Sequence, residues 1–201
     1  NATDDKTLKP GLPRAEYAMK PAAFLPYLAN VFWLLAPILA FNACFARRLP
    51  KRYQADVFDI GVPLWIRMPE NLSRLLVMLF PLVMRLQIST SSQQLGLALY
   101  VAGTAVYFAA WGVQIAFPQS GWSTSAAGFM APACTPALWL LGIGLLGDRL
   151  TLSNAPCSPW TYWSVCGIFL VFHNAHTWLV YARTKVGFVG DGTPAAVKPV
   201  D

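Results

Sequence analysis

Long stretches without a charged residue constrain this chain more than any other feature. No Asp, Glu, Lys or Arg lies within residues 21–46, 86–147 or 150–182. A helix needs about 20 residues to cross the hydrocarbon core of a bilayer, which is about 30 Å thick. Charged side chains inside that core are costly and rare. The uncharged stretches therefore predict an integral membrane protein that crosses the bilayer several times.

The composition supports the same conclusion and excludes a water-soluble enzyme. Hydrophobic residues make up 56% of the 201 residues and charged residues only 12%, against about 25% charged in ordinary soluble domains. A net charge of +6 would suggest nucleic acid as a partner of a soluble protein. Here we expect the basic residues to meet membrane lipid instead, and we expect no nucleic acid.

The predicted architecture is an all-α bundle of about five transmembrane helices between two polar arms. We expect an extended N-terminal arm over residues 1–21, a transmembrane domain over 22–183 and a flexible tail over 184–201. The expected spans are residues 22–46, 72–89, 95–117, 128–147 and 160–182.

The second of these spans is short, because only ten apolar residues separate Arg74 from Arg85. A helix lying in the membrane plane would need a polar face between the two arginines, yet Met78, Pro81 and Leu82 are apolar. We therefore expect residues 72–89 to cross, and a bundle of four helices if they do not. Glu70 precedes Arg74 by four residues, the spacing of a helical ion pair.

Basic residues at the ends of the predicted spans indicate the orientation. The cluster Arg47, Arg48, Lys51 and Arg52 follows the first span, and Arg183 and Lys185 follow the last. With five spans, both groups lie on one side, which the positive-inside rule makes the cytoplasmic side or its organellar equivalent. The N-terminus is then expected on the opposite side, and the first cluster at the lipid headgroups.

A row of small residues marks one face of residues 95–117. The residues Ala98, Ala102, Ala105, Ala109, Gly112 and Ala116 recur at steps of four and three. Such a row permits close approach of helix backbones in a membrane. We expect it to pack against a neighbouring helix of the same chain, or otherwise against a partner subunit, a pigment or a lipid.

The sequence contains two histidines, His173 and His176, within the last predicted span. Three residues apart, they share one face of a helix. No acidic residue is expected in the middle of a span to complete a metal site with them. Three roles remain open: hydrogen bonds to another helix through Asn30, Asn42 or Gln114, ligation of haem or chlorophyll by one histidine, and proton or substrate handling. We favour hydrogen bonding between helices, and expect no cofactor.

These features favour a non-catalytic accessory or binding subunit of a larger membrane assembly, with membrane lipid and other membrane subunits as partners. The sequence contains no hydrolase, metalloprotease, phosphate-loop or dinucleotide motif. A membrane enzyme or cofactor protein centred on His173 and His176 is the alternative. A small-solute transporter or channel is the second alternative, although no internal repeat supports it.

Overall fold

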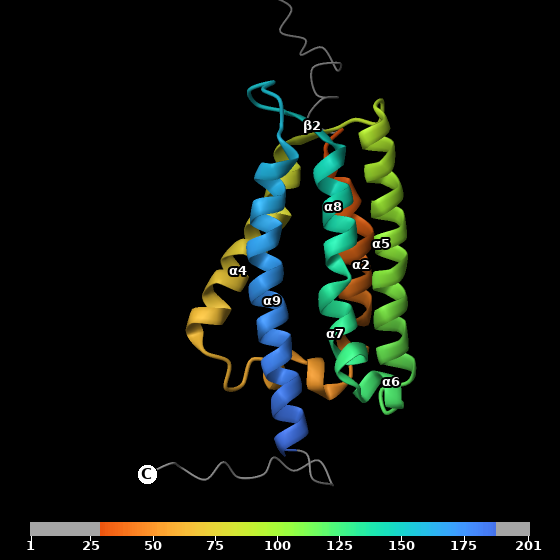
Figure 1. The fold of residues 1–201 in the computed structure, drawn as a ribbon, viewed down its shortest axis with the longest axis vertical. Coiled ribbons are helices and arrows are strands. Elements are labelled where there is room, and N and C mark those ends of the chain that lie inside the picture. The colour runs from red at the N-terminus through yellow and green to blue at the C-terminus, as the bar shows by residue number, and fades with distance from the viewer. Residues whose placement is uncertain (1–28, 188–201) are drawn as a thin grey trace, which may run out of the picture.

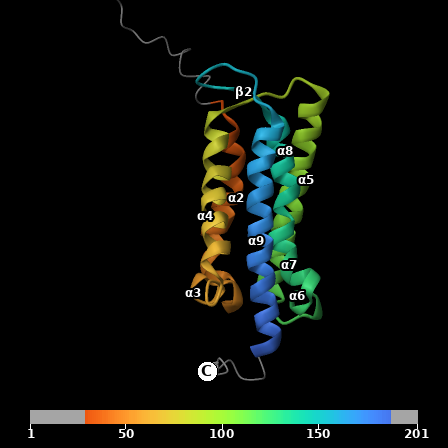
Figure 2. The same ribbon diagram turned by 60° about the vertical axis from the view of Figure 1, so that its left-hand side comes forward.

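The computed structural model describes residues 29–187, which form a bundle of helices running up and down along one axis (Figures 1 and 2). The expected N-terminal arm, the first residues of the first span and most of the expected tail lie outside this range. The α-helices are α2 (Ala36–Phe45), α3 (Ala55–Phe58), α4 (Leu64–Leu79), α5 (Ser91–Ala116), α6 (Gly121–Thr124), α7 (Ala126–Cys134), α8 (Pro136–Leu146) and α9 (Pro159–Gly187). Short 3-10 helices are η2 (Val31–Leu35), η3 (Ala46–Arg48), η4 (Lys51–Tyr53) and η5 (Phe80–Val83), and the strands are β1 (Met84–Leu86) and β2 (Gly147–Leu150).

Local sequence explains where the helices begin. Thr90 caps α5, because its side chain accepts a hydrogen bond from the Gln93 backbone while the Gln93 side chain caps Thr90 in return. Pro136 begins α8 and separates it from α7 within one continuous apolar segment. Gly61, with a positive φ of 67°, and Pro63 form the turn before α4.

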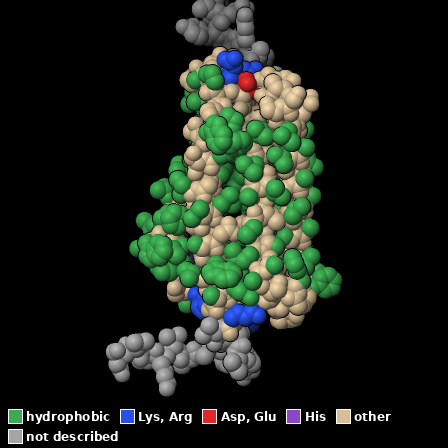
Figure 3. Space-filling view, viewed as in Figure 1, with side chains coloured by type: hydrophobic (Ala, Val, Ile, Leu, Met, Phe, Trp, Pro, Cys, Tyr) green, Lys and Arg blue, Asp and Glu red, His purple; other side chains and the backbone are tan. Residues whose placement is uncertain are grey.

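Within residues 29–187, four helical segments are long and apolar enough to cross a membrane, judged by length and composition: Val31–Arg48, Ser91–Ala116, Ala126–Leu146 and Pro159–Lys185. With little sheet beside them, they confirm the predicted all-α membrane bundle. On the face drawn in Figure 3, hydrophobic side chains are spread between the two ends, and Lys and Arg side chains lie at the ends.

The bounds predicted for the second span are wrong. The helix α4 begins at Leu64 rather than near residue 72, and it gives way through η5 to β1 before residue 89. The reason is that β1 pairs with β2 in an antiparallel ladder, which holds residues 84–86 in extended conformation. Helix α4 packs against α9, but it has only 16 residues and includes Arg67, Glu70 and Arg74. That α4 crosses the membrane remains a prediction.

Glycines bring the backbones of α5 and α8 into close contact. A Cβ added to Gly142 would lie 2.5 Å from the Gly96 carbonyl oxygen, and one added to Gly103 would lie 2.5 Å from the Trp139 backbone nitrogen. Tyr100, on the same face of α5, donates from its hydroxyl to the Leu34 carbonyl at 2.7 Å. Close backbone approach at small residues therefore does build the bundle.

The predicted row of small residues is not the surface that makes this contact. All six residues of the row, Ala98, Ala102, Ala105, Ala109, Gly112 and Ala116, are exposed. An added Cβ on Gly112 would meet nothing within 4 Å among the described residues. The prediction that the row packs within the chain is wrong, because the face carrying Gly96, Tyr100 and Gly103 faces α8. A contact of the row with a partner or lipid stays a prediction.

Most of the first basic cluster lies at the end of the bundle where α9 ends (Figure 1). Arg47, Arg48 and Lys51 are exposed there. Arg52 differs, because its guanidinium donates to the Gln114 side chain at 2.8 Å and to the Pro118 carbonyl at 2.9 Å. Arg52, which is partly exposed, is thus held against the protein by two internal acceptors, and its contact with lipid headgroups remains a prediction.

Candidate functional site

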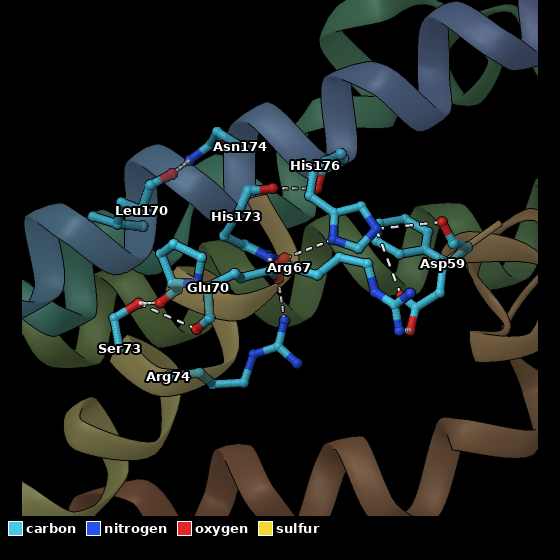
Figure 4. Close-up of polar contacts among 12 residues, drawn as sticks. Asp59, Arg67, Glu70, Ser73, Arg74, Leu170, His173, Asn174 and His176 are labelled. Carbon is cyan, nitrogen blue, oxygen red and sulfur yellow. Dashed lines mark hydrogen bonds and ion pairs between the residues drawn. The ribbon is translucent and has the colours of Figure 1, made fainter. Parts of the chain in front are cut away.

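A buried carboxylate lies between the two histidines. The Glu70 side chain, only 1% exposed, comes from α4 and points at α9 (Figure 4). Its Oε1 accepts a hydrogen bond from His173 Nδ1 at 2.9 Å, and its Oε2 lies 2.6 Å from His176 Nδ1. Arg74, one turn further along α4, pairs with the same carboxylate, which confirms the predicted helical ion pair. We call these four residues the Glu70 network.

The pattern of α4 explains why Glu70 faces inward. Ile66, Glu70, Ser73 and Val77 are the buried residues of this helix, spaced by four, three and four, which places them on one face. Pro69 interrupts the backbone ladder because it has no N–H. The Ser73 hydroxyl donates to the Pro69 carbonyl at 2.6 Å. Helix α4 nevertheless runs without a break from Leu64 to Leu79, past the point where its buried charge lies.

Aromatic rings hold both imidazoles in place. Phe169 stacks on His173 with ring centroids 5.0 Å apart, and Phe58 lies against His176 at 4.6 Å. His173 and His176 share one face of α9, as the sequence predicts, and both contact Glu70 from it.

The second ring nitrogen of His176 faces the end of α3. His176 Nε2 lies 3.3 Å from the Phe58 carbonyl oxygen and 3.6 Å from Asp59 Oδ1. Asp59 is 45% exposed and pairs with Arg67 at 3.2 Å. Both nitrogens of His176 therefore face oxygen atoms. This geometry suits either an imidazolium beside an ionised Glu70, or a neutral imidazole beside a protonated Glu70.

A cavity of about 240 Å³ adjoins the network. The segment of η4 and α3 contributes Tyr53, Ala55, Phe58 and Asp59, while α4 contributes Arg67, Glu70, Asn71 and Arg74, and α9 contributes His176. The Tyr53 hydroxyl donates to the Phe129 carbonyl at 3.0 Å, and burial raises the pKa of Tyr53 well above its usual value. Tyr53 is therefore a neutral wall of the cavity, and the charges come from the other residues.

The partners predicted for the histidines are wrong. Asn30 accepts from the Phe32 backbone, Asn42 accepts from the Tyr107 hydroxyl, and Gln114 bonds Arg52 and the Gly128 carbonyl. The sequence analysis also did not anticipate that an acidic residue would meet the histidines, although Glu70 does so from α4. Both outcomes have one cause: α4 begins earlier than expected, so it brings Glu70 to α9. The spacing of Ile66, Glu70, Ser73 and Val77 was the signal that could have shown it.

The histidines offer few ring nitrogens to a cofactor. Among residues 29–187, no group of at least three His, Cys, Asp or Glu residues is arranged to hold a metal ion. The Nδ1 atoms of both rings face Glu70, and Nε2 of His176 faces Phe58 and Asp59. Within the described part of the chain, Nε2 of the partly exposed His173 is the ring nitrogen through which haem or chlorophyll could be ligated.

Comparison of the chain with protein-family models, with curated proteins and with solved structures finds no match. The function is therefore argued from the site.

Proposed function

We propose that this chain is a non-catalytic binding subunit of a membrane assembly, and that the cavity beside the Glu70 network binds the anionic group of a membrane lipid. One observation carries the proposal. The Arg74 side chain is 44% exposed although it lies ten residues into α4, about 15 Å from the start of the helix.

The surroundings of Arg74 make this exposure significant. Leu72, Leu75 and Leu76 beside it on α4 are exposed large hydrophobic residues, as expected of a surface in contact with acyl chains. A guanidinium in such a setting is costly unless a polar or anionic group meets it. It has five N–H donors, and Glu70 accepts from Nη2. An anion at the cavity satisfies the donors that remain.

Arg67 supplies a second positive charge to the same cavity. It precedes Arg74 by seven residues, which places both on one face of α4 about 10 Å apart along the axis. Its side chain is 38% exposed and pairs with Asp59. Asn71, exposed between them, adds an amide donor. A lipid phosphate fits this set because guanidinium groups bind phosphate through paired N–H donors.

The same contacts favour binding over catalysis. Both oxygens of Glu70 and both ring nitrogens of His176 already have partners within the protein. A general acid or base needs a position within hydrogen-bond reach of a substrate proton. The network is better suited to fixing α4 on α9, so that Arg74 keeps its place at the cavity.

A membrane enzyme or cofactor protein is the second candidate, and the carboxylate beside two imidazoles favours it. In that case Glu70 and His176 exchange a proton during the reaction, or His173 ligates a pigment. An optical spectrum of the purified protein tests the cofactor branch, because haem or chlorophyll bound through His173 absorbs visible light and the His173→Gln variant loses that absorbance.

Native mass spectrometry of the detergent-purified chain tests the binding proposal. The protein is offered equal amounts of phosphatidylglycerol and phosphatidylcholine with identical acyl chains. We expect a preference for phosphatidylglycerol, reduced about tenfold or more in Arg74→Gln, since loss of one charged hydrogen-bonded pair is worth about 1.5–3 kcal/mol.

Arg149→Gln is the matched control, because Arg149 is a half-exposed arginine paired with Asp148 in β2. It should keep the full preference. Equal binding of the two lipids, or a preference that Arg149→Gln lowers as much as Arg74→Gln, contradicts the proposal. A co-purifying polypeptide that is lost from Arg74→Gln would mean that a protein partner occupies the site instead.

A further inference from the structure

We propose that Asp59 and His176 form a proton path from the exposed end of α3 to the buried Glu70, so that Glu70 is a proton-binding site inside the bundle. The path consists of contacts already described. Its outer member is the exposed carboxylate of Asp59, its middle member is an imidazole whose side chain is 4% exposed, and its inner member is a carboxylate that is 1% exposed.

The imidazole of His176 is placed to accept a proton at Nε2 and to release another from Nδ1. Its Nε2 lies 3.6 Å from Asp59 Oδ1, and its Nδ1 lies 2.6 Å from Glu70 Oε2. A proton taken from solvent by Asp59 moves to Nε2, and the proton on Nδ1 then moves to Glu70. Solvent loses one proton, Glu70 gains one, and the ring ends neutral with hydrogen on Nε2.

After the network has taken up a proton, two arrangements satisfy the hydrogen-bonding groups at the ring. With the proton on Glu70, the carboxyl O–H donates to Nδ1 and Nε2–H donates to the Phe58 carbonyl oxygen, 3.3 Å away. With the proton on His176, both N–H groups donate to oxygen. A buried polar group left without a partner costs about 1–3 kcal/mol. Neither protonated arrangement contains one at this ring, whereas before uptake the unprotonated Nε2 faces two oxygen atoms. The hydrogen bonds that Glu70 accepts from His173, His176 and Arg74 favour its ionised form, so the proton rests on His176 and moves to Glu70 on acidification.

The charges around the path come from three sides. Asp59 and the neutral Tyr53 face it from the segment before α4, Arg67 and Arg74 from α4, and His173 from α9. Further along α9, Arg183 donates to the Val57 carbonyl at 3.1 Å, at the other side of α3. Helices α7 and α8, which also pack on α9, contain no Asp, Glu, Lys, Arg or His. Glu70 is thus the acid that contacts Arg74, His173 and His176 together, while Asp59 faces the outer nitrogen of His176.

Proton uptake also changes the lipid site, a consequence that rests on the proposed function. A protonated Glu70 no longer neutralises Arg74, whose guanidinium is then free to pair fully with a phosphate. Anionic lipid therefore binds more tightly when Glu70 carries the proton.

Infrared difference spectroscopy of the whole chain in phosphatidylcholine vesicles tests the path without an anionic lipid. Acidification should produce the C=O band of a protonated carboxyl that is absent from Glu70→Gln. On transfer to D₂O the band should shift rapidly in the wild type and about tenfold or more slowly in His176→Phe, since a positioned proton carrier is worth about 10²–10⁴ in rate.

Asp59→Asn changes an exposed residue and should slow the shift without affecting folding, while the exposed Asp56→Asn on α3 should not slow it. A missing Glu70 band, or equal exchange in wild type, Asp59→Asn and His176→Phe, overturns the path.

Phosphatidylglycerol binding measured across the same pH range separates the two proposals. Tighter binding on acidification, with Glu70→Gln binding tightly at every pH, supports the coupling. A Glu70 band with normal exchange but no lipid binding leaves the path standing and refutes the proposed function.

Discussion

Replacing Glu70 by alanine should destabilise the bundle strongly. The substitution removes the acceptor for His173, His176 and Arg74 and leaves His176 Nδ1 buried without a partner. Hydrogen bonds to a charged group contribute about 1.5–3 kcal/mol each, and the half-exposed Arg74 adds little. Removing one member of a buried charged cluster costs about 3–5 kcal/mol. For a chain of this length, that lowers the melting temperature by about 10 °C.

Glutamine at position 70 separates the loss of charge from the loss of contacts. The Gln side-chain oxygen can accept from His173 Nδ1–H while its amide donates to His176 Nδ1, with Nε2–H kept on the Phe58 carbonyl. We therefore expect Glu70→Gln to cost only about 1–2 kcal/mol.

Thermal melting of the detergent-purified variants, monitored by circular dichroism, measures the difference in stability between Glu70→Ala and Glu70→Gln. Asp56→Ala, at an exposed position of α3, is the control. The reasoning is refuted if Glu70→Ala melts with the wild type, or if the Ala and Gln variants melt together well below it.

Three further predictions concern packing and thiol chemistry. Gly142→Ala should cost about 1–3 kcal/mol, since its Cβ would lie 2.5 Å from backbone atoms of α5, whereas Gly112→Ala, in open space, should be neutral in the same melting assay. Ala105→Leu, on the exposed row of α5, should change stability by less than about 0.5 kcal/mol, and a larger loss would mean that the row is packed. Burial and the nearby charge of Asp148 raise the pKa of Cys157, so its thiolate accumulates only at higher pH. Maleimide should therefore label Cys157 more slowly in the folded chain than in the denatured chain, and equal rates would contradict this.

The long uncharged stretches alone predict the membrane bundle, because an apolar segment of that length is typical of a transmembrane helix. The sequence also places His173 and His176 on one face, since that follows from helical spacing. The sequence does not predict α4 in the same way. Its charged residues are typical of a connector that lies at the membrane surface. Whether Glu70 is wet or buried depends on which face of α4 meets α9, and that is a tertiary contact.

The small-residue row on α5 illustrates the same difficulty. Two faces of this helix carry small residues at helical spacing, the row containing Ala105 and the face containing Gly96 and Gly103. Spacing does not distinguish them, because the choice depends on whether Gly142 of α8 lies opposite. Glycine, which lets backbones approach more closely than alanine, was the better guide.

A double-mutant cycle between Glu70→Ala and His176→Ala tests most directly whether the contact between Glu70 and His176 holds α4 against α9. With Nδ1 and Oε2 only 2.6 Å apart and both side chains buried, the coupling energy should be about 1.5–3 kcal/mol. Stability losses that add within about 0.5 kcal/mol would mean that the two residues do not interact, and would contradict the site itself.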